Sequence, residues 1–108
     1  MKIRKIEEMF RGWFIGNFEP SVIKTKDFEV ALLNHYKNEI WPKHYHKEAD
    51  EINVLISGSM SVNGVKLVPG DILHIEKNEI AEPIFHEDCK LICVKLPSVP
   101  GDKYEVKE

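Results

Sequence analysis

Short runs of β-forming residues separated by turn residues are the feature of this sequence that most constrains its fold. The runs are 28–36, 52–58, 59–68, 71–76 and 90–96. Asn63-Gly64 divides the third run and favours a hairpin, because a type I′ turn needs positive φ at both central positions. Pro69-Gly70-Asp71 marks another tight turn. Several short strands at this spacing predict an all-β sandwich or barrel.

The chain has 108 residues, a length typical of one domain. We expect a single domain over 1–108, with a core barrel at about 28–97, an N-terminal arm at 1–27 and a C-terminal tail at 98–108. The first dozen residues contain apolar positions at helical spacing, so a short helix and an extended arm are both open there. These positions are Ile3, Ile6 and Phe10.

The charge balance gives no reason to expect nucleic acid or an anionic membrane as a partner. Fifteen basic residues face eighteen acidic ones, for a net charge of −3. No apolar run approaches the roughly 20 residues that span a bilayer. The start MKIRKIEEMF resembles a signal peptide in its basic residues, but Glu7 and Glu8 interrupt any apolar segment. We therefore expect a cytoplasmic protein.

Cys89 and Cys93 lie in one predicted strand, CKLICVKL. Strand geometry places them on the same face but roughly 13 Å apart, and a disulfide needs Cα atoms within about 7 Å. Two cysteines alone also make no zinc site. We expect free thiols in a reducing compartment.

The stretch HYHKEADEINVLISG, 44–58, carries the candidate site. The period of a strand puts His44 and His46 on one face. Glu51 follows a short polar connection, which can bring its carboxylate back beside the two imidazoles. Two imidazoles and one carboxylate suit divalent Fe, Mn, Ni or Zn. Nothing in the sequence indicates an organic cofactor.

This stretch resembles the first motif of the cupins, a His-x-His pair with Glu after four residues and Gly after six more. The matching residues are His44, His46, Glu51 and Gly58. GVKLVPGDILHIEKNEIAEPIF is similar to the second motif, so the resemblance covers about 44–96. The flanks resemble those of small single-domain cupins without a settled activity. The resemblance implies a double-stranded β-helix, or jelly roll, with the ligand face pointing into the barrel.

One position departs from the cupin pattern. Aligning the turn of the second motif on 76–78 places Ala81 where the last histidine ligand stands in cupins. Glu82 and His86 are the nearest alternatives, but strand parity points both of them outward if Ala81 points inward. The site therefore has at most three of four expected ligands. An ion, or a hydrogen-bonded network of the same three side chains, is open at this stage.

Other residues near the site have competing interpretations. We expect His74, in an apolar strand, to be a core or cavity-lining residue. His35 and Tyr36 either line the barrel mouth or are exposed at a strand end. Trp41, three residues before His44, is a candidate wall of the pocket.

The resemblance implies two main functions. One is a metal-assisted isomerase or epimerase acting on a sugar or nucleotide-sugar, with His44 or His46 as base and Glu51 orienting it or holding the metal. The alternative is a non-catalytic module that binds or senses a small polar molecule. A barrel filled by side chains such as Leu55 is a third possibility. A fold analogy alone does not choose among them.

The alternation of inward and outward residues along the strand at 52–58 also indicates how the protein assembles. If Glu51 points inward, then Ile52, Val54 and Ile56 form an apolar outer face. We expect the segment from Trp13 to Phe18, a second copy, or both to cover this face, and we favour a homodimer.

Overall fold

The computed structural model describes residues 1–107 and is almost entirely β-structure. One 3-10 turn, η1 (Ile6–Glu8), interrupts an otherwise extended N-terminal segment. The strands are β1 (Trp13–Gly16), β2 (Ile23–Lys24), β3 (Glu29–His35), β4 (His44–Tyr45), β5 (Asp50–Ser57), β6 (Met60–Val62), β7 (Val65–Leu67), β8 (Ile72–Ile75), β9 (Pro83–Phe85), β10 (Cys89–Leu96) and β11 (Tyr104–Glu105).

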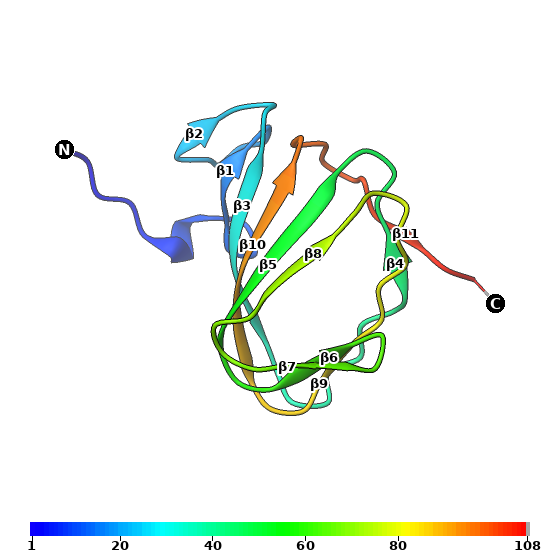
Figure 1. The fold of residues 1–108 in the computed structure, drawn as a ribbon. Helices are drawn as coiled ribbons and strands as arrows, with labels where there is room; N and C mark the ends of the chain where they lie inside the picture. Colours follow the sequence, from blue (N-terminus) through cyan, green and yellow to red (C-terminus); the bar gives the residue numbers. More distant parts are fainter. Residues whose placement is uncertain (108) are drawn as a thin grey trace.

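Two β-walls enclose the interior (Figure 1). One wall is a six-stranded sheet in the order β2-β1-β3-β10-β5-β8. The other consists of β7-β6-β9 and β11-β4, which an antiparallel bridge between His44 and Ala81 connects. This arrangement is the expected double-stranded β-helix barrel.

Two turn positions explain how the sequence closes this barrel. Asn63 and Gly64 both have positive φ, 51° and 79°, between the paired residues Val62 and Val65, as the predicted hairpin requires. Gly58 has a φ of 96°, and a Cβ there would lie 2.2 Å from the carbonyl oxygen of Asp88. Only glycine permits this close approach of the two strands.

The interior is divided between an apolar end and a polar end. On β5 and β10, Leu55 is paired with Leu91, and Glu51 is paired with Lys95. The leucines belong to the apolar cluster at the end closed by β6, β7 and β9. This cluster comprises Leu55, Met60, Val62, Leu67, Ile75, Ala81, Phe85, Cys89 and Leu91. Glu51 and Leu55 have the same parity on β5, so the polar and apolar groups lie at opposite ends of one inward face.

The sheets extend beyond the range predicted for the core barrel, 28–97. In the N-terminal arm, β1 pairs with β3, and in the C-terminal tail, β11 pairs with β4. Cys89 and Cys93 are free thiols, as predicted, and both are buried. Within residues 1–107, no helix is long and apolar enough to cross a membrane. Residue 108 of the predicted tail lies outside the described residues.

Candidate metal and ligand site

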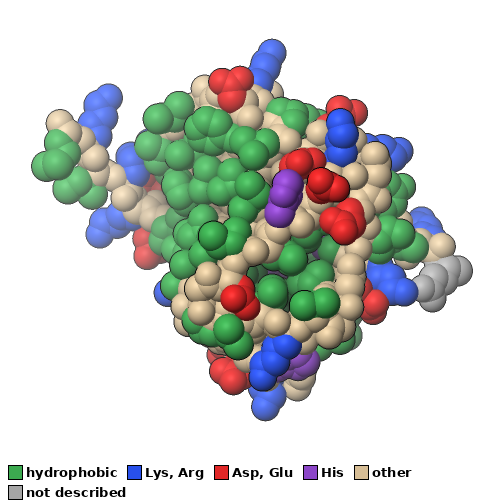
Figure 2. Space-filling model, viewed as in Figure 1, with side chains coloured by type: hydrophobic (Ala, Val, Ile, Leu, Met, Phe, Trp, Pro, Cys, Tyr) green, Lys and Arg blue, Asp and Glu red, His purple; other side chains and the backbone are tan. Residues whose placement is uncertain are grey.

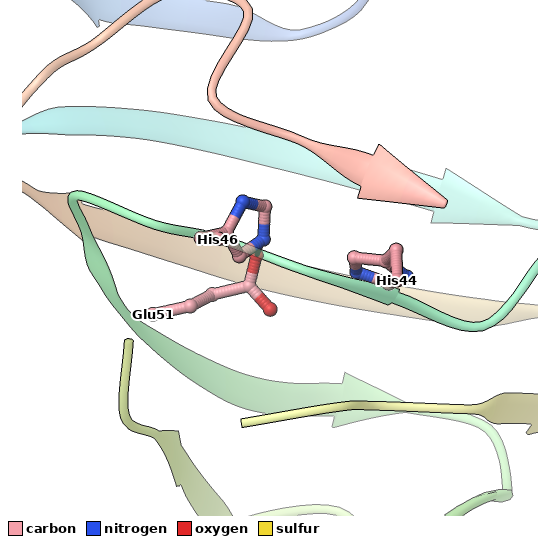
Figure 3. Close-up of side chains that lie close together, drawn as sticks. All are labelled: His44, His46 and Glu51. Carbon is pink, nitrogen blue, oxygen red and sulfur yellow. Dashed lines mark ion pairs between the residues drawn. The ribbon is translucent and has the colours of Figure 1, made fainter. Parts of the chain in front are cut away.

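His44, His46 and Glu51 converge in the barrel, as the sequence predicted. All three are buried, and one potential ligand atom from each lies within 4.8 Å of the others. Figure 3 shows the His46 ring next to the Glu51 carboxylate, with His44 further along the same segment. The two rings come from β4 and the residue that follows it, whereas Glu51 comes from β5.

Backbone carbonyls fix the tautomers of both imidazoles. His44 Nδ1 donates to the carbonyl oxygen of Pro42 at 3.0 Å, and His46 Nδ1 donates to the carbonyl oxygen of Asp102. A carbonyl accepts but cannot donate, so each Nδ1 carries a proton. In the neutral rings, the lone pair is therefore on Nε2, which is the arrangement found in metal-ligating histidines.

The buried Nε2 of His46 has no hydrogen-bond partner. It lies 3.3 Å from Oε1 of Glu51, but the two atoms do not make a well-oriented hydrogen bond. An imidazole lone pair and a carboxylate oxygen are both acceptors, so they repel unless a proton or a metal cation lies between them. These donor atoms therefore fit a divalent cation, and the set of two imidazoles and one carboxylate matches the chemistry of Fe, Mn, Ni or Zn.

Glu51 is held as an anion. Burial would raise its pKa, but a proton on His46 Nε2, the charge of Lys95 and the hydrogen bond from Asn53 outweigh burial and bring the pKa to about 2. Asn53 Nδ2 donates to Oε2 at 2.9 Å, and Lys95 Nζ is 3.9 Å from Oε1. The carboxylate therefore carries its charge at neutral pH, as a metal ligand must.

His44 is held in the neutral form. Burial lowers its pKa from the ordinary value of 6.5, and this effect exceeds the opposing influence of the Pro42 carbonyl and of Glu51. A neutral imidazole has a free Nε2 lone pair at neutral pH. It can therefore accept either a metal ion or a proton.

The buried Asp102 holds the segment that carries His46. Its carboxylate accepts the backbone N–H groups of Lys47, Glu48 and Ala49 at 2.9, 3.0 and 3.0 Å. Its own carbonyl accepts the proton of His46 Nδ1. Asp102 thus positions the loop and the ring together, although it lies more than fifty residues away in the chain.

Ala81 lies at the position that the cupin resemblance assigns to the fourth ligand. It is buried in the core cluster and borders the cavity beside His44. Glu82 and His86 are exposed, and His86 is hydrogen-bonded to Ser61 at 2.7 Å. Neither replaces the missing ligand, which confirms the parity argument made from the sequence.

A cavity of about 800 Å³ opens in front of the three site residues. Trp41 forms part of its wall, as predicted, with its ring centroid 6.4 Å from that of His44. His35 also lines it, stacked on Phe85 at 4.3 Å and bonded to Glu39 at 2.6 Å, whereas Tyr36 is exposed.

The prediction for His74 was wrong. Its side chain is 51% exposed and bonds to Asp50 at 3.0 Å on the outer face of β8. His74 is paired with Ile52, whose parity is outward, so the apolar neighbours in the sequence did not indicate which face it occupies.

Several residues of the site were missed by the sequence analysis. Lys95 has the same parity as Cys93 on β10 and therefore points inward, a signal that period two alone provides. Asp102 and Lys103 come from an irregular segment near the C-terminus, where no periodicity indicates direction. Their proximity to β4 arises only from the pairing of β11 with that strand.

No known family model matches this sequence, and no curated protein matches it closely enough to count as a relative. Solved structures with the same fold do exist. An uncharacterized conserved protein with a double-stranded β-helix domain from Klebsiella pneumoniae subsp. pneumoniae is 19% identical, with a TM-score of 0.71 over 99% of this chain and 93% of that one.

Two further structures match parts of longer chains. DMSP lyase DddQ from Ruegeria pomeroyi is 14% identical, with a TM-score of 0.72 over 87% of this chain and 49% of that one. Bacterial pirin YhhW in complex with nickel(II) from Escherichia coli is 20% identical, with a TM-score of 0.65 over 82% of this chain and 39% of that one. This chain therefore spans half or less of these two proteins. Together with similarity to a cupin-2 domain protein, these matches confirm the small cupin fold that the sequence resemblance implied.

Proposed function

We propose that this cupin-fold protein holds a divalent metal ion on His44, His46 and Glu51 and acts on a small polar molecule in the adjoining cavity. The reaction we favour is isomerisation or epimerisation of a sugar or nucleotide-sugar. The observation that carries the proposal is the buried, unpartnered Nε2 of His46 facing the Glu51 carboxylate.

The similar solved structures are compatible with this proposal. One of them is a lyase and another is a complex with nickel(II). At 14% and 20% identity they share the fold with this chain, and the chemistry has to be argued from its own residues.

The chain's residues divide the chemical work. A divalent cation, when bound, supplies a Lewis acid that polarises a carbonyl or hydroxyl oxygen. Glu51 supplies the fixed negative charge, and the Asp102 carbonyl orients His46. Trp41 and several apolar side chains form much of the cavity wall. In the metal-free site, neutral His44 is the side chain able to take a proton from a carbon next to a carbonyl.

Metal analysis and exchange experiments test this proposal. We expect purified protein soaked with Fe, Mn, Ni or Zn to retain about one equivalent after desalting, and the variant His46→Ala to retain none. His74→Ala is the matched control, because that histidine lies on the outer surface. Proton exchange into D2O across a panel of sugars and nucleotide-sugars then measures turnover. Loss of metal from the control as strongly as from His46→Ala contradicts the assigned site.

Ala81 favours a second candidate function, a binding or sensing module without turnover. If catalysis had been lost and binding kept, replacement of the fourth ligand of the cupin pattern by alanine is the kind of change expected. Ligand binding without exchange, unchanged in His44→Ala and Glu51→Ala, supports this alternative. Exchange that these variants abolish supports the enzyme.

A further inference from the structure

Three cationic side chains border the cavity that contains the metal site. Lys95 comes from β10, Lys103 precedes β11, and Arg11 precedes β1. Lys95 Nζ lies 5.1 Å from the ring centroid of Trp13, and Lys103 Nζ lies 3.7 Å from that of Trp41. Two indole rings therefore contact two ammonium groups that border the cavity.

These cations are poorly compensated by the protein. Among residues 1–107, no carboxylate oxygen pairs with Lys103 or Arg11 within 4.0 Å. Lys95 has only Glu51, at the long distance of 3.9 Å. The pKa of Lys103 is lowered, first by burial and then by the nearby charge of Lys95. Such like-charge repulsion is relieved when an anion enters.

Three carboxylates line the cavity: Glu39 and Glu51 are already engaged, and Glu7 is exposed in η1. Glu39 is hydrogen-bonded to His35 at 2.6 Å, and Glu51 faces His46 and accepts a hydrogen bond from Asn53. Neither of these two carboxylates pairs with Lys103 or Arg11, so the positive charge of those side chains is available to a ligand.

We propose that this pocket binds a small α-hydroxy or α-oxo carboxylate. Its carboxylate lies against Lys95 and Lys103, and its neighbouring oxygen points towards His44, His46 and Glu51. The second oxygen is placed on the α-carbon because of a distance. Lys95 Nζ lies 3.9 Å from a Glu51 oxygen, so a ligand carboxylate at Lys95 lies next to the ligand oxygen at the proposed metal site. The role of the second oxygen rests on the proposed metal function, whereas the carboxylate subsite does not.

Oxalate is the probe that tests this inference, because it has two adjacent carboxylates and no other functional group. Titration calorimetry on the Ni(II)-loaded protein and NMR titration on the metal-free protein measure its dissociation constant. We expect Lys103→Gln to raise that constant roughly tenfold in both forms, because a charge-assisted contact is lost. Lys103→Arg retains the charge and is expected to retain most of the affinity. Lys90→Gln, an exposed position on β10, is the matched control and leaves oxalate binding unchanged.

The same variant separates this inference from the metal proposal. Removing a cation near the site leaves Ni(II) affinity without oxalate unchanged or increased, whereas damage to the fold lowers both affinities and the unfolding temperature. Oxalate binding that Lys103→Gln and Lys95→Gln leave intact overturns the carboxylate subsite. Equal affinity for neutral oxamide, or for inorganic phosphate, also overturns it. If the protein retains no metal and oxalate still binds through Lys103, the carboxylate subsite is supported and only the metal function is refuted.

Discussion

His44 and Ala81 are direct backbone partners within one wall of the barrel: each backbone N–H donates to the other's carbonyl, at 3.0 and 2.9 Å. In an antiparallel pair of this kind, the two side chains lie on the same side of the sheet, about 5 Å apart. The methyl group of Ala81 therefore borders the cavity at the place where a fourth ligand stands in the cupin pattern.

Restoring that ligand is expected to strengthen metal binding. Ala81→His places a third imidazole beside His44, and we expect the Ni(II) dissociation constant to fall by about tenfold or more, which is about 1.4 kcal/mol. Competition with a chromophoric chelator measures it. Glu82→His is the control, because that residue is exposed on the outer side. Equal gains in the two variants would mean that Ala81 does not face the ligand set.

Asp102 is expected to be the most sensitive carboxylate in the C-terminal segment. Asp102→Asn replaces a buried anion that accepts three backbone N–H groups, and we expect a loss of about 1–3 kcal/mol in the free energy of unfolding. Urea denaturation measures this value. Asp88→Asn, which removes the charge from an exposed carboxylate bonded to the N–H of Lys37, is expected to change it much less. Similar losses in both variants would contradict this role.

Stability is expected to fall in acid because of the site itself. Glu51 has a pKa of about 2 in the folded protein against an ordinary value of 4.5, a difference of about 3 kcal/mol. Between these values the unfolded chain binds a proton that the folded protein does not, so the free energy of unfolding decreases as pH falls from 4.5 towards 2.

His44 adds to this loss at higher pH. Burial lowers the pKa of His44, so the contribution of His44 to the free energy of unfolding begins to decline as pH falls below 6.5. Urea denaturation of the metal-free protein at several pH values measures both effects. In Glu51→Gln the slope below pH 4.5 is expected to be smaller than in the wild type. An identical slope in the two proteins would show that the Glu51 carboxylate is not the group responsible.

An apolar stripe crosses the outer face of the six-stranded sheet, in the register Leu32, Ile92, Val54 and Ile72 on β3, β10, β5 and β8. The segment around η1 borders Leu32 and Ile92, and Figure 2 shows hydrophobic side chains gathered beside the N-terminal segment. Phe14, from the segment expected to cover this face, borders the same two residues, whereas Trp13 contributes to the cavity wall. Val54 and Ile72, at the other end of the stripe, are not among the described residues that border the segment around η1.

We propose that a second copy covers the exposed end of this stripe, in the homodimer that the sequence led us to expect. Sedimentation is expected to give about twice the monomer mass of 12.5 kDa. Ile72→Glu is expected to give the monomer, because the side chain is 68% exposed at the edge strand β8. Ile84→Glu, 51% exposed on β9, is the control. A monomeric wild-type protein would contradict the dimer. If Ile84→Glu alone dissociated, the dimer interface would lie on another face.

Local sequence patterns were sufficient to predict the fold and the three candidate ligand residues. Turn residues with obligatory positive φ, such as Gly64, and strand alternation identify the hairpins and the inward faces. His44, His46 and Glu51 were recognised because a strand's period and a short connection bring them together within eight residues. The same parity argument placed Glu82 outside the barrel.

The sequence by itself therefore determined the class of barrel and the three candidate ligand residues, because turn residues and strand alternation can be recognised within short stretches of chain. Only the tertiary structure decided which carbonyls fix the imidazoles, which cations stand at the cavity entrance, and which face His74 occupies. Asp102 meets His46 across 56 residues, in a segment without periodicity. Such contacts are selected by the packing of the whole barrel, and no local rule of spacing carries that information.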